Sequence, residues 1–158
     1  MILNVHERTL PSAAGALIDT LSGSDDRLWP HDRWPAQRFD RPLGVGAVGG
    51  HGPVRYDVRD YEPGRRVRFG FRGPAGFHGY HEYEALAAPD GGCLLRHSLV
   101  LEPRGRARLT WPLIYRPLHD ALIEDSLATA ARNLGVAGDR PQWSVWVRLL
   151  RFLAGRRA

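Results

Sequence analysis

The chain has 158 residues, which is the size of one domain, with 43% hydrophobic residues, 25% charged residues and a net charge of +5. Its single cysteine, Cys93, excludes an intrachain disulfide and a zinc or iron–sulfur centre held by several cysteines. The basic residues are arginines without any lysine, and they alternate along predicted strands instead of clustering with aromatic residues. We therefore expect no nucleic-acid partner.

The N-terminal residues and the hydropathy of the chain bear on its location. The N-terminal sequence MILNVHERTL lacks the basic region and the long apolar run of a signal peptide. No stretch reaches the roughly 18 apolar residues that a membrane span requires. A single cysteine also fits a reducing compartment. These features predict a soluble, cytoplasmic protein.

The first predicted strand covers residues 2–10, where side chains alternate between two faces. Leu3 and Val5 lie on one face, and Asn4 and His6 lie on the other. A period of two residues is typical of an extended strand, because successive side chains point to opposite sides.

A short helix is predicted over residues 11–23, with Ser12 as its N-cap. Residues 24–44 follow, and three prolines there exclude a long helix, so we expect at most one helical turn near residues 25–28. Within this segment, the sequence WPHDRWP combines two large rings with His and Asp. These residues either seal one end of a core or border the mouth of a binding site.

The middle of the chain predicts strands separated by turns that contain Gly or Pro. The strands are expected near residues 44–48, 53–62, 65–72, 79–88, 93–103 and 104–110. In the last of them, Ala107 and Leu109 are expected to point inward and the arginines outward. On residues 79–88, Glu82 and Glu84 are expected on the outer face, where Arg66, Arg68 and Arg96 can pair with them across strands.

A long helix is predicted over residues 116–134, and a separate helix in the tail. The order of elements indicates an α+β fold: a curved antiparallel sheet of about seven strands around a long C-terminal helix, with an internal cavity between them. We divide the chain into a domain of residues 1–138 and a hinge with an amphipathic, Trp- and Arg-rich tail, residues 139–158.

This arrangement resembles the helix-grip superfamily, which includes START-type lipid-transfer domains, the birch-pollen-allergen family and bacterial polyketide cyclases and aromatases (SRPBCC proteins). The resemblance covers residues 1–135. It is carried by GPVRYDVRDYEPGRRVRFGF, by GYHEYEALAAPDGGCLLRHSLVLE and by the helix that starts at Trp111. It implies an apolar pocket for a lipid, a polyketide or another hydrophobic molecule. No catalytic motif of these families transfers to particular residues here.

The alternation of side chains along the strands predicts which residues line the cavity. His97 and Leu99 lie on the clearer core face of residues 93–103, and the neighbouring strand then turns His81 and Tyr83 inward. The predicted ligand-binding residues are Trp34, Tyr56, Phe69, Phe71, His81, Tyr83, His97, Leu99, Trp111 and Leu122.

His81, His97 and Tyr83 are the candidate catalytic residues. A histidine can give or take a proton near neutral pH, and a tyrosine can donate a hydrogen bond to a carbonyl, as cyclisation and aromatisation require. The alternative is that the two histidines are interior residues that bond to each other, to a tyrosine or to water in the pocket. We expect no metal, because no carboxylate is clearly turned inward with them, and no cofactor.

The long helix carries His119, Asp120, Glu124 and Asp125, which we expect to form a solvated flank. Periodicity alone does not decide which face of this helix, residues 112–134, meets the sheet.

Three functions are compatible with these features. The first is binding of a hydrophobic small molecule between the sheet and the long helix. The second is a polyketide cyclase or aromatase that uses His81 and His97 as acid and base. The third is a membrane-surface or protein-interaction module that acts through residues 141–154, by self-association or by peripheral contact with a membrane, where Trp and Arg are well placed. The alternative for the tail is that it only docks on its own domain.

Overall fold

The structure, a computed structural model, describes residues 1–136 and 139–155. Its centre is a seven-stranded antiparallel sheet with the strand order β1-β7-β6-β5-β4-β3-β2. The strands are β1 (Ile2–Leu10), β2 (Arg38–Phe39), β3 (Val48–His51), β4 (Val54–Glu62), β5 (Arg66–Gly73), β6 (Phe77–Ala87) and β7 (Cys93–Pro103). The helical elements are η1 (Ser12–Thr20), α1 (Ala107–Thr110), η2 (Trp111–Tyr115), α2 (Arg116–Asn133) and α3 (Val145–Gly155).

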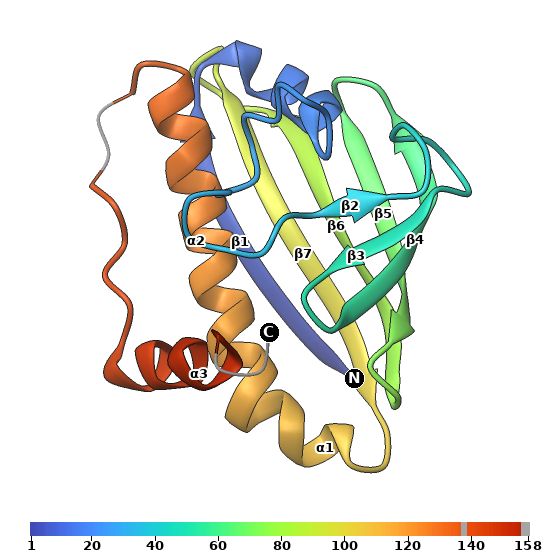
Figure 1. Cartoon of the computed structure of the whole chain (residues 1–158). Helices are drawn as coiled ribbons and strands as arrows, with labels where there is room; N and C mark the ends of the chain where they lie inside the picture. The colour runs from blue at the N-terminus through green and yellow to red at the C-terminus, as the bar shows by residue number, and fades with distance from the viewer. Residues whose placement is uncertain (137–138, 156–158) are drawn as a thin grey trace.

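The first strand of the chain pairs with the last one. β1 runs antiparallel to β7, with Ile2 opposite Leu101 and Leu10 opposite Cys93. From β2 to β7, strands that follow each other in sequence are neighbours in the sheet. β1 is therefore an edge strand, and Figure 1 shows α2 lying beside it, so the beginning of the chain meets the last long helix.

The inner face of the sheet is the face that α2 covers. Figure 1 shows η1 at one end of this face and the segment between η1 and β2 crossing in front of the strands. Ser126 of α2 donates a hydrogen bond from Oγ to the carbonyl oxygen of Leu28 in that segment, over 2.9 Å. The indole ring of Trp29 lies 4.8 Å from the imidazole of His51 on β3. The main hydrophobic core is enclosed between these layers.

The predicted α+β class, the antiparallel sheet and the long C-terminal helix are confirmed. Two predicted strands differ from the structure. The strand expected near residues 44–48 lies further along the chain, as β3, and residues 104–110 form a turn followed by α1. Gly105 has a φ of 54°, in the left-handed region that glycine tolerates, and the chain reverses there into a helix. Leu109, expected to point inward, is 70% exposed. The seventh strand is instead β2, whose two residues are too few to show an alternating pattern.

The first helix differs from expectation in type and in capping. η1 is a 3-10 helix of nine residues that starts after Pro11, and no side chain caps it, so Ser12 is not the capping residue that we expected. Gly15 explains part of its position. A Cβ atom there would lie 2.2 Å from the carbonyl oxygen of Gly64, so only glycine lets η1 approach the β4–β5 turn this closely.

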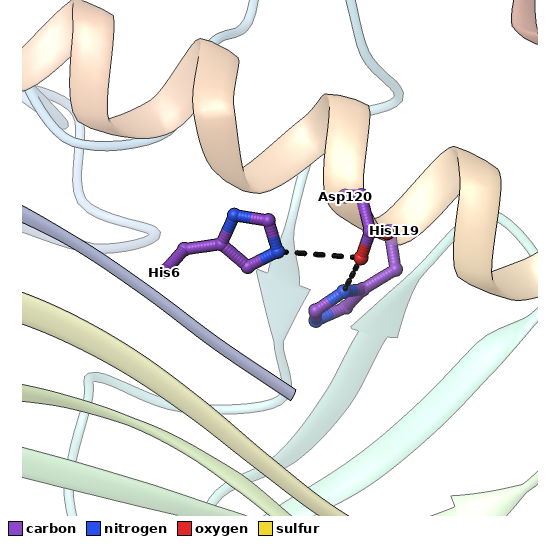
Figure 2. Close-up of side chains that lie close together, drawn as sticks. All are labelled: His6, His119 and Asp120. Atoms are coloured by element: carbon purple, nitrogen blue, oxygen red, sulfur yellow. Dashed lines mark hydrogen bonds and ion pairs between the residues drawn. The ribbon is translucent and has the colours of Figure 1, made fainter. Parts of the chain in front are cut away.

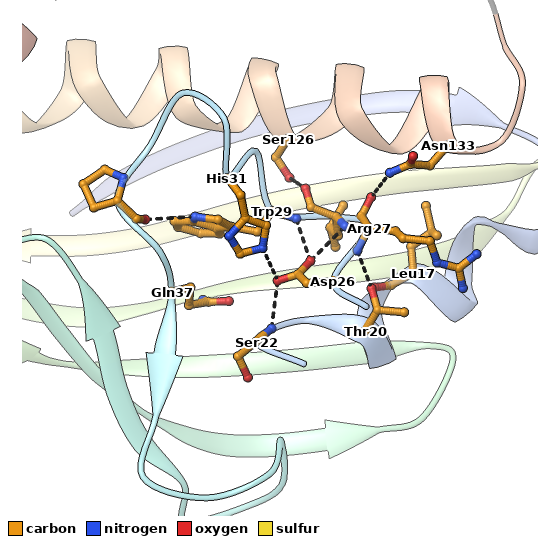
Figure 3. A network of polar contacts seen from close by, with 12 residues as sticks. Leu17, Thr20, Ser22, Asp26, Arg27, Trp29, His31, Gln37, Ser126 and Asn133 are labelled. Carbon is orange, nitrogen blue, oxygen red and sulfur yellow. Dashed lines mark hydrogen bonds and ion pairs between the residues drawn. The ribbon is translucent and has the colours of Figure 1, made fainter. Parts of the chain in front are cut away.

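Residues 25–28 do not form the helical turn that we allowed. The carboxylate of Asp26 accepts hydrogen bonds from the backbone N–H groups of Leu28 and Trp29, over 3.0 and 2.8 Å, and from that of Ser22, over 2.8 Å. Figure 3 shows Asp26 at the centre of this network. An aspartate that binds backbone N–H groups competes with helix formation, and here it fixes an irregular loop.

The structure decides which face of α2 meets the sheet. Leu122, Ile123, Ser126, Leu127 and Ala130 are buried, and they recur at the spacing of one helical face. Asp125 is also buried, with 2% of its surface exposed, so the prediction that it belongs to a solvated flank is wrong.

The outer face of the sheet carries cross-strand ion pairs, as predicted, but with partly different partners. Arg68 Nε donates to Glu82 over 2.7 Å, which confirms that pair. Arg66 binds Asp60 instead of a glutamate of the neighbouring strand, and Arg96 binds Glu7 of β1 over 2.9 Å. Among the helices of the described residues, none is long and apolar enough to cross a membrane.

Candidate functional site

β1 turns its polar side chains toward α2. Leu3 and Val5 are 68% and 44% exposed on the outer face, whereas the alternate residues point inward. Asn4 Nδ2 donates to Asp120 Oδ1 over 2.9 Å, and His6 Nδ1 lies 2.7 Å from Glu124 Oε1. The predicted alternation is therefore present, but the face that meets the helix is the polar one.

His6, His119 and Asp120 meet at this junction, as Figure 2 shows. His6 Nε2 lies 3.3 Å from Asp120 Oδ1, and His119 Nδ1 lies 3.2 Å from the same oxygen. One ligand atom from each residue lies within 4.8 Å of the others, and these are residue types that can hold a metal ion. We expected His119, Asp120 and Glu124 on a solvated flank, and Asp120 and Glu124 are indeed 34% and 40% exposed, but both bind His6.

Hydrogen bonding and burial shift the pKa values of this cluster in opposite directions. The hydrogen bond to Asp120 raises the pKa of His6 despite the lowering effect of burial. Burial dominates at His119 and lowers its pKa. Burial alone would raise the pKa of Asp120, but hydrogen bonds from His119, His6 and Asn4 outweigh it and hold that pKa below its usual range. Asp120 is therefore a carboxylate at neutral pH.

A row of histidines continues from this cluster across the inner face of the sheet. The ring of His119 lies 5.1 Å from that of His97, and His97 Nε2 lies 3.2 Å from His81 Nδ1. The ring of His81 lies 4.9 Å from that of Tyr56, whose hydroxyl is 3.0 Å from His51 Nδ1. We call His6, His119, His97, His81 and His51 the histidine layer. It contains most of the seven histidines of the chain.

Several imidazole nitrogens of the layer have no hydrogen-bond partner. These buried atoms are His81 Nε2, His97 Nδ1 and His119 Nε2. Burial holds the pKa values of His81 and His97 well below the usual value, so both rings are neutral at pH 7. A neutral imidazole carries one proton, so whichever ring donates between them, one N–H and one nitrogen lone pair stay unpaired. Such groups are rare in a dry core, because each costs about 1–3 kcal/mol.

The predicted ligand-binding residues all point into the interior, on two sides of the histidine layer. His97 and Tyr83 are 0% and 1% exposed, and His81 is 7% exposed. The main core contains Trp34, Tyr56, Phe69, Tyr83 and Leu122, and a smaller cluster contains Leu99 and Trp111 with Phe71 packed against it. His81 stacks against Phe69 of one cluster and Phe71 of the other. The inward placement is confirmed; a role in binding or catalysis stays a prediction.

Trp29 and Trp34 are buried parts of the core, with 3% and 7% of their surfaces exposed. Trp34 Nε1 donates to Asp125 Oδ2 over 2.7 Å, and Trp143 of the tail donates to the same oxygen over 2.8 Å. Arg33 Nη1 donates to Asp125 Oδ1 over 2.6 Å. The two tryptophans of the WPHDRWP segment are thus part of the core, and Asp125 ties the segment to α2 and the tail.

Two hollows open on the surface away from the middle of the histidine layer. The first, of about 340 Å³, is lined mainly by β3 residues and includes His51 and Arg55. The second, of about 390 Å³, lies where Arg33 meets Trp143 and Arg148. The internal cavity stays a prediction. The first hollow reaches the end of the layer, because His51 forms part of its wall.

We expect acid to destabilise the protein partly through His51. Gln37 Nε2 donates a hydrogen bond to the Tyr56 hydroxyl over 2.7 Å, so the Tyr56 O–H can donate in turn to His51 Nδ1. Burial lowers the pKa of His51 to about 3. The unfolded chain binds this proton near pH 6.5 and the folded chain does not, so stability falls as pH drops from 6.5 toward 3.

His51→Gln should therefore reduce the slope of unfolding free energy against pH by up to about 1.4 kcal/mol per pH unit, which corresponds to the uptake of one proton on unfolding. Urea denaturation at a series of pH values measures this slope. His78→Gln, which removes an exposed histidine, is the control and should leave it unchanged. Equal slopes for wild type and His51→Gln would contradict the assignment.

No family model matches the sequence, and no curated protein matches it. Solved structures do match. A protein from Thermobifida fusca aligns with a TM-score of 0.64 at 16% identity, over 89% of this chain and all (100%) of that one. CalU16 from Micromonospora echinospora aligns with a TM-score of 0.60 at 13% identity, over 98% and 84% of the two chains. A protein from Bordetella parapertussis has a TM-score of 0.55 at 16% identity, over 99% and 86%.

The chain shares the fold of these proteins. At such identities the likeness concerns the fold alone: an α+β chain with an antiparallel sheet and a long C-terminal helix, consistent with a helix-grip fold.

The sequence did not single out the cluster of β1 and α2. His6 and Asp120 are 114 residues apart, and nothing near either one marks the other as its neighbour. The available signal was the pair Asp120 and Glu124, which lie four residues apart on one helical face, combined with a histidine on a strand. It becomes informative only once β1 is known to lie beside α2.

Proposed function

We propose that the protein binds a small, largely apolar molecule between the inner face of the sheet and α2. The observation that carries the proposal is the set of unpaired nitrogens of His81, His97 and His119, which lie between two hydrophobic clusters. A ligand that hydrogen-bonds to these nitrogens removes the free-energy cost of leaving buried polar atoms unpaired. A core with a purely structural role would avoid that cost by using apolar residues.

The chemistry of the layer limits the ligand. The His81–His97 pair offers one N–H donor and one lone pair, which suits a carbonyl together with a hydroxyl. Aromatic and aliphatic side chains flank the pair on both sides, and they suit a ring system or an acyl chain. These features fit a lipid or a polyketide-like molecule, as the helix-grip resemblance implies.

Native mass spectrometry of the purified protein tests the proposal. We expect a co-purified apolar molecule, or uptake of the fluorescent apolar probe 1-anilinonaphthalene-8-sulfonate by the folded protein. The double variant His81→Leu/His97→Leu should lose this binding at least tenfold, and the exposed-site control His78→Gln should keep it. Binding that is the same in the double variant and in wild type would refute a site at the layer.

Acid–base catalysis on the same ligand is the narrower alternative, as in a polyketide cyclase or aromatase. It is favoured by the 3.2 Å contact between His81 and His97, which can relay a proton if the outer nitrogen of one ring takes up a proton from the ligand while the outer nitrogen of the other ring gives one back. Tyr83 supports this role less, because its hydroxyl already bonds Ser126 Oγ over 2.9 Å. Turnover that is lost in His81→Gln while ligand affinity is kept would favour the enzyme.

A second candidate function is peripheral binding to an anionic membrane, which the tail and the start of the long helix support. The tail docks on its own domain, with Val147 buried and Trp146 Nε1 bonded to the carbonyl oxygen of Leu113. Large apolar side chains of α1, η2 and α3 stay exposed: Leu109, Leu113, Ile114, Val145, Trp146, Leu149 and Leu153. Residues 103–119 and 140–155 contain arginines but neither Asp nor Glu, which suits anionic lipid.

Vesicle flotation tests this second candidate. We expect binding to vesicles that contain phosphatidylglycerol, weaker binding in high salt, and little binding to phosphatidylcholine alone. Trp146→Ser/Leu149→Ser should reduce binding at least tenfold, whereas Leu3→Ser/Val5→Ser, which removes exposed apolar groups from β1, should not. Failure of wild type to float with anionic vesicles would rule the candidate out.

A further inference from the structure

The cluster of His6, His119 and Asp120 borders the proposed ligand site and shares His119 with it: His119 Nδ1 faces Asp120, whereas Nε2 is one of the unpaired nitrogens of the histidine layer. It lies at the edge of the sheet, where β1 meets the first turns of α2, and its side chains are partly exposed: 15% for His6 and 14% for His119. Solvent therefore has access to it without any opening of the core. Two imidazoles and one carboxylate are the set that first-row transition metals accept in sites that keep open positions.

The geometry points to a binding site for a divalent transition-metal ion, with His6 Nε2, His119 Nδ1 and Asp120 Oδ1 as its ligands, and we propose Zn²⁺ as the representative ion. In a tetrahedral zinc site, bonds of about 2.0–2.1 Å place ligand atoms about 3.3–3.4 Å apart. The two N···O distances in the cluster are 3.3 and 3.2 Å, so two edges of that tetrahedron are already formed.

The surroundings of His6 match those of a metal-bound histidine. Its second nitrogen, Nδ1, lies 2.7 Å from Glu124 Oε1, which can accept a hydrogen bond from Nδ1–H; in that tautomer Nε2 has a free lone pair for the metal. Ligating histidines commonly donate their other N–H to a carboxylate in this way, and the contact fixes the orientation of the ring. Asn4 Nδ2, 2.9 Å from Asp120 Oδ1, orients the carboxylate. Glu124 and Asn4 are thus positioning residues.

Charge balance also permits a cation, although two arginines oppose it. The Asp120 and Glu124 carboxylates together offset the two charges of a divalent ion. Arg116 Nε lies 3.6 Å from Asp120 Oδ2, and Arg8 Nη2 lies 3.5 Å from Glu124 Oε2. Each arginine contacts the second oxygen of its carboxylate, whereas the first oxygen contacts the histidines. The ion takes the place of the protons that now lie between the two rings and Asp120 Oδ1.

Titration of the full chain with Zn²⁺ by calorimetry, and with Co²⁺ by visible absorption, tests the site. We expect one ion per chain and an intense Co²⁺ d–d band, as low-coordinate cobalt shows. His6→Gln and His119→Gln should each weaken binding at least 100-fold. Glu124→Gln should weaken it about 10–100-fold, since only the positioning contact is altered. Arg116→Gln should tighten binding several-fold, because an opposing charge is removed.

The control is His78→Gln, which removes an exposed histidine on β6 and should leave the affinity unchanged. Circular dichroism of each variant checks that it is folded, and Asp120→Asn keeps the shape of the side chain should His6→Gln unfold. No binding by folded wild type at equimolar Zn²⁺ would overturn the proposal. Equal affinity in wild type, His6→Gln and Asp120→Asn would also overturn it. Neither result bears on the apolar-ligand site, whose test uses His81 and His97.

Discussion

Asp125→Ala is expected to lower the free energy of unfolding by about 3–5 kcal/mol, since removing one member of a buried charged network leaves the others without partners. The carboxylate accepts hydrogen bonds from Arg33, from Trp34 and from Trp143. Both indole N–H groups lose their acceptor in the variant. Arg33 is 20% exposed and can partly return to water, which places the expected loss toward the lower end of that range.

Chemical denaturation measures this loss, and limited proteolysis measures its second effect. Because Trp143 is tied to the domain through Asp125, residues 139–155 should become more accessible to protease in the variant. Asp32→Ala is the matched control: Asp32 binds Arg140 over 2.5 Å but is 46% exposed, so its removal should cost less than about 1 kcal/mol. Similar losses in the two variants would show that burial of the Asp125 network contributes little.

The second large effect concerns the His81–His97 pair. His97→Leu alone should destabilise the protein by about 1–3 kcal/mol at pH 7, because His81 Nδ1 then loses its partner within the core. His81→Leu/His97→Leu removes both polar rings, replaces them with apolar side chains of similar volume and should be at least as stable as wild type. The pair would then be retained at a cost in stability, as expected of a functional site.

A double-mutant cycle in urea, from wild type, the two single variants and the double variant, gives the coupling energy between the rings. The apolar-probe assay on the same four proteins compares stability with binding. If the double variant loses as much unfolding free energy as the two single variants together, each ring has other partners. The unpaired nitrogens would then not explain ligand binding.

Much of the sheet could be predicted from the sequence because its strands carry alternating patterns. In β5, Val67 and Phe69 are buried while Arg68 binds Glu82 on the outer face, so the period of two was visible. Residues 104–110 alternate as well, yet they form a turn and a helix. Arg106 and Arg108 alternate with small and apolar residues in seven positions only, and the left-handed Gly105 overrides so short a pattern.

The inward direction of the candidate site followed from the same strand parity, which correctly placed His81, Tyr83 and His97. The burial of Asp125 could not be predicted in that way. A carboxylate on a helix is usually solvated, and its partners, Trp34 and Trp143, lie 91 and 18 residues away. Periodicity reports the face of an element, whereas a buried polar network depends on which elements become neighbours.

The pairing of β1 with β7 and α2 has a consequence for the order in which the chain folds. His6 meets Glu124 across 118 residues of sequence, so the loop that this contact closes contains most of the chain. The hairpins from β3 to β7 involve short loops and can form early, while β1 must wait for its partners. During synthesis β1 therefore leaves the ribosome before the elements that it contacts but acquires its place among the last, and its unpaired backbone stays open to wrong partners until β7 and α2 have emerged.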